Sequence, residues 1–323
     1  KTQIIPNFTL FWILMLRDYM RYCGTSAENI KLLRSMIGTA AHALDGFDAY
    51  VLPNGLVGNT PYWHFVDWVP GWSGGIPSGN PDEPITVSTL MYAAALKAAA
   101  ELYEMLGRSG TALDYRRKAE DAIRAAYEHC YDKEAGLFRN KPSVSEYSQH
   151  TTLWAILSGA VQGKEAGELI DRTFNAKTPV AVCTFSMSHY MFRALELANR
   201  YDAYAKRQIE GWEKMLDLHC TTWCENPDSP RSECHGWSSA PIYEFSAMVL
   251  GVAPTAPGYD AVCIKPHPHA YDLSWASGTI PTPHGVISVA WEKHDGTFSM
   301  RVTLPDTAMR CEIVMPDGST YMQ

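Results

Sequence analysis

The strongest constraint on this chain is a helical pattern that runs through most of its length and then stops. From about residue 8 to residue 250, apolar residues recur three and four positions apart, which is the spacing of one face of an α-helix. The pattern predicts about nine helices. They are expected at residues 8–22, 27–46, 86–106, 110–130, 146–160, 164–174, 184–199, 202–216 and 237–250.

Signals for helix ends agree with several of these ranges. Ser26 and Ser145 stand where N-caps are expected, because a serine oxygen accepts a hydrogen bond from the first turn of a helix. Gly107 and Gly159 stand where helices are expected to stop. The segment AAALKAAAEL, residues 93–102, has high helix propensity and small side chains that allow close packing.

The character of the sequence changes after Gly251. The segment VAPTAPGYD has the composition of a linker, and β-like runs follow it at 261–264, 285–291, 297–304 and 311–315. The turn signals HDG and PDG separate the later runs. We therefore predict two domains. They are a mainly α domain at 1–252 and a small antiparallel β-sandwich at 253–323.

The arrangement of the helices stays open at this point. Consecutive helical pairs are compatible with an (α/α)6 barrel that lacks some of its six pairs. They are equally compatible with an ordinary helical bundle. Periodicity alone does not separate these two architectures.

Composition and motifs exclude several classes of function. The net charge of −8 argues against a nucleic-acid partner, which requires a basic face. The most apolar stretch, Phe8 to Leu16, is too short to span a membrane, and it continues as an amphipathic helix that indicates no compartment. Nucleotide-binding, zinc-protease and serine-hydrolase motifs do not occur.

We expect no cofactor and no metal, because the group His219, Cys220, Cys224, Cys234 and His235 lacks the close pairing of a zinc site.

Two long loops interrupt the helical pattern, and long loops in compact domains are usually functional. The first, at about 48–85, carries Trp63, Trp68 and Trp72 around a single carboxylate, Asp67. Indole faces suit the apolar face of a sugar ring, and Asp67 could accept a hydrogen bond from a sugar hydroxyl. The alternative is that the aromatic residues fill a core while Asp67 caps a turn.

The second loop, at about 217–236, places Glu225 next to Trp223, and His235 and Trp237 follow it closely. An inverting glycosidase needs a carboxylate that activates water, and Glu225 has a suitable aromatic setting. The alternative is an ordinary solvated glutamate. His150, at the start of a predicted helix, could line the same cavity, or it could be a half-buried histidine at a capped helix start.

At these loops the sequence resembles glycoside hydrolase family 78, the α-L-rhamnosidases, over essentially the whole chain. The resemblance rests on IIPNFTLFWILMLRDYMRYCG, PYWHFVDW, EYSQH, TTWCE, SECHGWSSAP, APGYDAVCIKPH and SGTIPTPHGVISVAW. It implies an (α/α)6 barrel followed by an all-β domain, and an inverting release of terminal α-L-rhamnose from glycans or plant glycosides. By resemblance, Glu225 is the general base and His235 contacts the sugar. Asp67 and Trp68 line the subsite, with Trp63 and Trp72 beside them.

One family feature is missing from this sequence. The family carries its general acid in a D-C-P-x-x-E type of segment, upstream of the string with which this chain begins, and no such segment occurs here. About three barrel helices would lie in that portion. We therefore expect a fragment with little activity alone, which associates with the missing N-terminal portion or with itself. A non-catalytic carbohydrate-binding protein, or another (α/α)6 hydrolase such as an unsaturated uronyl hydrolase, remains an alternative.

Overall fold

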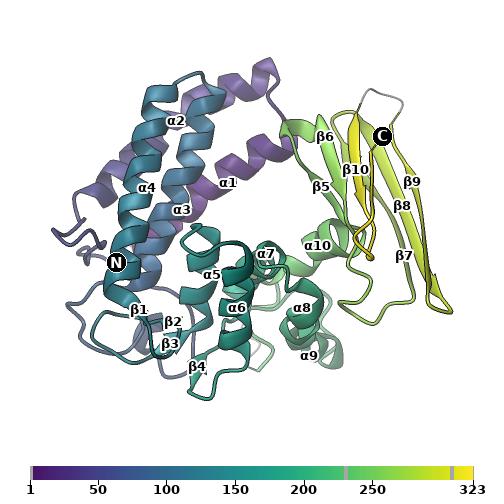
Figure 1. The fold of residues 1–323 in the computed structure, drawn as a ribbon. Coiled ribbons are helices and arrows are strands. Elements are labelled where there is room, and N and C mark those ends of the chain that lie inside the picture. Colours follow the sequence, from purple (N-terminus) through teal and green to yellow (C-terminus); the bar gives the residue numbers. More distant parts are fainter. Residues whose placement is uncertain (1–2, 229–231, 306–308, 323) are drawn as a thin grey trace. The chain divides into compact units, whose positions relative to one another are not determined.

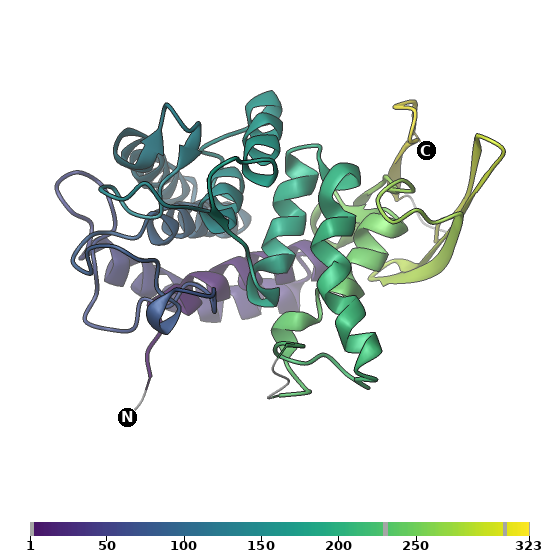
Figure 2. The ribbon, with the colours of Figure 1, turned by 90° about the horizontal axis from the view of Figure 1, so that it is seen from below.

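A computed structural model describes residues 3–228, 232–305 and 309–322. The chain forms two compact units: unit 1 comprises Lys1–Arg17 and Ile30–Asn199, and unit 2 comprises Asp18–Asn29 and Arg200–Gln323. The unit boundaries fall within helix α1 (Pro6–Cys23), within the first turn of the next helix, and between Asn199 and Arg200. The elements can be followed in Figures 1 and 2. The predicted domain boundary at 252/253 stays a prediction.

Unit 1 is built from helices that lie close to their predicted ranges. After α2 (Ala27–Asp48), α3 packs against α4 and α5, and α5 packs against α6 and α7. In Figure 1, α3 and α4 run side by side. The bounds are Thr86–Met105 for α3, Ser109–Cys130 for α4, Gln149–Leu157 for α5, Gly163–Phe174 for α6 and Phe185–Leu197 for α7.

Helix α3 forms the centre of this unit. It is buried on almost all of its faces, including most of the Ala-rich segment 93–102. Small side chains let the neighbouring helices approach on every side, as expected of a helix without a strong polar face. Lys97 reaches out of this surface, and its Nζ donates to the carbonyl of Ser158 at 2.6 Å.

Short strands that the sequence did not predict connect these helices. Strands β1 (Tyr131–Asp132) and β2 (Leu137–Phe138) pair antiparallel, while β3 (Tyr147–Ser148) and β4 (Val180–Ala181) pair parallel. Because β3 is extended, α5 starts later than predicted. Ser148 caps it by accepting from the Thr151 N–H at 3.3 Å, in place of the expected Ser145.

The helical part of unit 2 is more irregular. The predicted helix 202–216 is α8 (Tyr201–Ile209) and α9 (Glu213–Asp217), joined by a 3-10 turn at Glu210–Trp212. The predicted helix 237–250 is α10 (Ala240–Glu244), which continues as a π-helical turn. Among the described residues, no helix has the length and hydropathy needed to cross a membrane.

Two β-sheets complete unit 2. One has the order β11-β10-β6-β5 and the other β7-β8-β9. All pairs are antiparallel except β6 and β10, which are parallel. The bounds are Val252–Pro254 (β5), Ala261–Ile264 (β6), Trp275–Thr282 (β7), Gly285–His294 (β8), Thr297–Thr303 (β9), Arg310–Val314 (β10) and Thr320–Met322 (β11).

One apolar core joins both sheets, as expected of a β-sandwich. Val262 and Ile264 from β6 share it with Ile287, Val289 and Trp291 from β8. The Trp291 indole N–H is satisfied within the core by the carbonyl of Val249, at 2.7 Å. The predicted strands β6, β8, β9 and β10 are confirmed. Strand β7 was not predicted because its glycine and proline lower its β propensity.

Candidate active site

Asp67 is the centre of a hydrogen-bond network in unit 1. Its side chain is completely buried, and its two oxygens accept from five described groups. These are the Trp68 N–H at 2.8 Å, His150 Nε2 at 2.7 Å, the Thr184 N–H at 2.8 Å, and the Thr184 and Ser186 hydroxyls. The network joins the Trp-rich loop to the starts of two helices.

The two helix starts meet because of the β3–β4 pair. That pair places the chain after β4 beside the first turn of α5, where the Cys183 N–H donates to Gln149 Oε1 at 3.0 Å. Thr184 then occupies the N-cap position of α7, and His150 lies in the first turn of α5. Helix N-termini favour negative charge, so this location stabilises the Asp67 carboxylate.

The protonation of Asp67 reflects two opposing effects. Burial raises its pKa. The hydrogen bonds from His150, Ser186 and Thr184, together with the charge of His150, lower the pKa by more than burial raises it. The net result is a pKa below the ordinary aspartate value. Asp67 therefore stays ionised at neutral pH and serves as a fixed acceptor that holds the loop.

The three indoles of this loop differ in exposure. Trp72 is buried and its ring lies 5.0 Å from the His150 ring, between centroids. Trp63 is half-buried, with its Nε1 donating to the carbonyl of Gly74 at 2.8 Å. Trp68 is 43% exposed and packs against Phe65, with 5.0 Å between ring centroids. Among these three indoles, Trp68 offers the most surface to a ligand. Sugar contacts by this loop remain a prediction.

His150 is also completely buried. Its Nε2 bonds Asp67, and its Nδ1 has no hydrogen-bond partner among the described residues. The geometry makes His150 a support for the loop, and its contact with a sugar stays a prediction.

In unit 2, the second loop brings Glu225 and His235 together. The Glu225 N–H donates to the carbonyl of Ser232 at 2.7 Å, and the His235 N–H donates to the carbonyl of Trp223 at 2.8 Å. Two short segments of the loop therefore run antiparallel. This pairing places residues that are ten positions apart at one end of the loop.

Aromatic contacts complete this cluster. The rings of His235 and Trp237 lie 4.1 Å apart between centroids, and the Trp237 indole N–H approaches the carbonyl of Glu225 at 3.5 Å. Glu225, Trp223, His235 and Trp237 are all half-buried, so each keeps some access to solvent. The structure thus groups the four residues that the sequence singled out in this loop. Within this loop, the structure describes residues 217–228 and 232–236.

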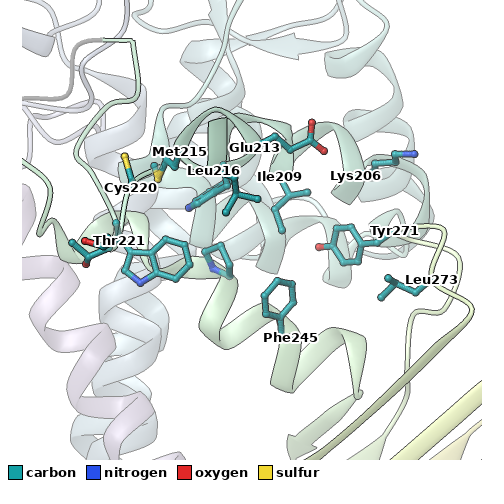
Figure 3. Close-up of a pocket in the computed structure, with 14 residues that line it drawn as sticks. Lys206, Ile209, Glu213, Met215, Leu216, Cys220, Thr221, Phe245, Tyr271 and Leu273 are labelled. Carbon is teal, nitrogen blue, oxygen red and sulfur yellow. The ribbon is translucent and has the colours of Figure 1, made fainter. Parts of the chain in front are cut away.

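An apolar pocket of about 610 Å³ adjoins the first part of this loop. Trp223 lines it, while Glu225, His235 and Trp237 are not among its lining residues. Leu216, Phe245 and Ile209 extend toward its centre, whereas the charged ends of Lys206 and Glu213 point away from it (Figure 3). This pocket can take an apolar group, and it presents little polar chemistry.

Metal ligands do not gather in the described part of the chain. No group of three or more His, Cys, Asp or Glu residues is placed to hold an ion there. All eight cysteines are free thiols. Cys224, next to Glu225, is buried, and desolvation raises its pKa, as does the neighbouring Cys220. The thiol of Cys224 is therefore a neutral neighbour of the cluster.

Sequence reasoning missed Thr184 and Ser186 as members of the first cluster. The polar segment before α7 carried a signal, because threonine and serine are common at helix N-termini. Their partner could not be read from the sequence, because Asp67 lies 117 residues from Thr184.

Helices followed along the chain by two β-sheets, with carboxylates and indoles in the long loops, are the architecture of a six-hairpin glycoside hydrolase. The family model for the bacterial alpha-L-rhamnosidase 6 hairpin glycosidase domain matches residues 26–249. The model for the bacterial alpha-L-rhamnosidase C-terminal domain matches residues 251–323. The chain therefore belongs to the bacterial α-L-rhamnosidase family, and the predicted fold class is confirmed.

Individual relatives carry the same description. The α-L-rhamnosidase of Alteromonas sp. (strain LOR) is 24% identical over 260 residues, which are 75% of this chain and 28% of that protein. The α-L-rhamnosidase of Formosa agariphila is 22% identical over 272 residues, covering 79% of this chain and 29% of that protein. The chain thus spans less than a third of the length of these relatives.

Solved structures agree on the fold. The family 78 rhamnosidase of Bacillus sp. GL1 is 27% identical, with a TM-score of 0.85, and the match covers 98% of this chain and 34% of that one. The α-L-rhamnosidase of Streptomyces avermitilis, solved with L-rhamnose, has a TM-score of 0.70 at 19% identity, covering 92% of this chain and 28% of that one.

Proposed function

We propose that this chain supplies the catalytic base of an inverting glycoside hydrolase that releases terminal α-L-rhamnose from glycans or glycosides. The family membership of the chain supports the reaction class. The observation that carries the assignment is the pairing that groups Glu225 with His235 and Trp237. A carboxylate that can activate water is one of the two carboxyl groups that an inverting mechanism requires, and a partly exposed imidazole and indole beside it can contact a sugar.

In this proposal Glu225 removes a proton from a water molecule as that water attacks the anomeric carbon. The attack occurs opposite the leaving group, so the configuration at the anomeric carbon inverts. His235 hydrogen-bonds a sugar hydroxyl, and the indoles of Trp223 and Trp237 contact the apolar face of the ring.

An inverting mechanism also needs a general acid to protonate the departing oxygen. We assign no residue of this chain to that role. We therefore propose that the chain alone hydrolyses an aryl α-L-rhamnoside poorly, and that a polypeptide which includes an acid-bearing segment is active. Turnover by the chain alone at the rate of the longer polypeptide would contradict this part of the proposal.

The test of the base is Glu225→Gln in a polypeptide that contains this chain and hydrolyses an aryl α-L-rhamnoside. We expect turnover to fall by about 10²-fold or more, because the water loses its general base. The matched control is Glu233→Gln, an exposed carboxylate of the same loop, which should leave turnover unchanged. In the unmodified enzyme, proton NMR of the first product should show the inverted anomer. Near-normal turnover of Glu225→Gln, or a retained anomer, would refute the proposed mechanism.

A further inference from the structure

The outer face of the three-stranded sheet β7-β8-β9 carries an unusual set of side chains. Across the strands, Trp275 lies opposite Glu292, and Glu292 lies opposite Ser299. In the next row on the same face, Ser277 lies opposite Ala290, and Ala290 lies opposite Arg301. We call these six residues the β7–β9 patch. Its strands can be followed in Figure 1.

The patch faces solvent and the other side of the same strands faces the core. Residues that alternate with the patch, such as Ala276, Trp291 and Met300, pack into the apolar core between the sheets. Trp275 is 65% exposed, although a side chain of this size and apolarity usually gains free energy from burial. A large exposed indole on a rigid strand is an anchor of the kind that binding sites use.

The patch is hollowed. A depression of about 410 Å³ is lined by all six of its residues and by the intervening Ala276, Trp291 and Met300. Ala290 lies on the middle strand between Ser277 and Arg301, and its small side chain leaves room in that row. The volume is within the range of small-molecule sites. The lining residues lie on strands whose pairing with their neighbours fixes their positions.

The chemistry of the walls selects among ligands. Glu292 Oε1 accepts from the Ser299 hydroxyl at 3.3 Å, and the two carboxylate oxygens keep further acceptor capacity. Arg301 offers a fork of donors, and the Ser277 hydroxyl can donate or accept. One acid and one base leave the patch without net charge, which disfavours a strongly charged ligand. A neutral molecule with adjacent hydroxyls and one apolar face matches the acceptors, the donors and the indole together.

We propose that the β7–β9 patch is a carbohydrate-binding site that takes a neutral sugar of a glycan. The ring of the sugar stacks on Trp275, and its hydroxyls donate to Glu292 and accept from Arg301. The site is built on different elements from the Glu225 loop, and it does not depend on the hydrolytic function proposed above. Its effect would be to hold the protein on a glycan surface.

Fluorine NMR of the full chain labelled with 5-fluorotryptophan tests this proposal. Trp275→Phe identifies the Trp275 signal. The probes are methyl α-L-rhamnopyranoside, methyl β-D-glucopyranoside, methyl β-D-galactopyranoside and methyl α-D-mannopyranoside. We expect at least one of them to shift the Trp275 signal saturably in the millimolar range. Glu292→Ala and Arg301→Ala should each weaken that binding about tenfold or more, because each removes a charged hydrogen-bond partner.

The matched control is His294→Ala, an exposed residue of β8 outside the depression, which should bind like the unmodified chain. The Trp275 signal reports binding at this site and not at the Glu225 loop. An inactive Glu225 variant should therefore bind the sugar at the β7–β9 patch as well as the unmodified chain does. No saturable shift with any probe would overturn the proposal, as would binding that is unaffected by the Glu292 and Arg301 variants. A Trp275 shift that follows protein concentration without sugar would assign the face to a second copy of the chain and would also overturn it.

Discussion

His150 Nε2 lies 2.7 Å from Asp67 Oδ2, and both side chains are completely buried. The contact joins residues that are 83 positions apart, one in the Trp-rich loop and one in the first turn of α5. Thr184 and Ser186 hold the same carboxylate from the start of α7. The hydrogen bonds of Asp67 therefore fix the Trp-rich loop to two helix starts.

Asp67→Asn should destabilise unit 1 by about 2–4 kcal/mol. Asparagine keeps the shape of the side chain but places an NH₂ group against groups that already donate, so buried donors lose their acceptor. Urea unfolding measures the change, and Asp82→Asn is the control, because Asp82 is exposed in the same loop. If both variants unfold at the same urea concentration, the network does not hold the loop.

Gly75 is required by the fold of the same loop, and Gly71 supplies a matched comparison. Both have positive φ, 69° and 88°, where a side chain costs about 1–2 kcal/mol. A Cβ at Gly75 would lie 2.5 Å from the ring of Phe65, whereas a Cβ at Gly71 has nothing within 4 Å.

Gly71→Ala should therefore lower the free energy of unfolding by about 1 kcal/mol, and Gly75→Ala by at least about 1 kcal/mol more. Gly75 also accepts from the N–H groups of Val66 and Asp67, so the clash should disturb the carboxylate. Urea unfolding of both variants gives the comparison. Equal losses of unfolding free energy in the two variants would show that the positive φ alone accounts for glycine at position 75.

The stability of unit 1 should depend on pH through His189 in α7. Desolvation lowers the pKa of His189 to about 4 from 6.5, and the charge of Arg193 adds to this effect. Between these two values the unfolded chain binds a proton that the folded chain does not. Stability is therefore highest above pH 6.5 and falls as the pH decreases toward 4.

The contribution of His189 is at most about 3 kcal/mol. Asp67 contributes only at lower pH, because its folded pKa lies below 3.8, so the two effects separate. Thermal unfolding of His189→Gln and of the unmodified chain between pH 7 and pH 4.5 checks this. The variant should lose less stability on acidification. Parallel curves would remove His189 as the cause.

The sequence predicted the long helices of unit 1 because their apolar residues recur at helical spacing. It merged α8 with α9 and missed the 3-10 and π-helical turns of unit 2, which helical spacing does not distinguish from an α-helix. It missed the β3–β4 pair, since two-residue strands have no period to detect. That pair is what brings Thr184 to Asp67, so the network in unit 1 was hidden with it. The cluster around Glu225 was predicted because its members lie within one loop, and resemblance to a family supplied their roles. The β7–β9 patch was hidden because β7 has an atypical strand composition.

His235 tests the proposed sugar contact without touching the proposed base. In an active polypeptide, His235→Asn should raise KM for an aryl α-L-rhamnoside about tenfold while changing kcat less, because a hydrogen bond to bound substrate is lost. The control is His219→Asn. His219 is exposed in the same loop at φ 56°, a conformation that asparagine tolerates. The melting temperatures of both variants should stay close to that of the parent, since the half-buried ring of His235 packs on Trp237 and makes one long contact, 3.4 Å from Nδ1 to the Ser232 hydroxyl. A KM that does not change in His235→Asn would leave His235 as a packing partner of Trp237, and it would remove the sugar contact from the proposed site.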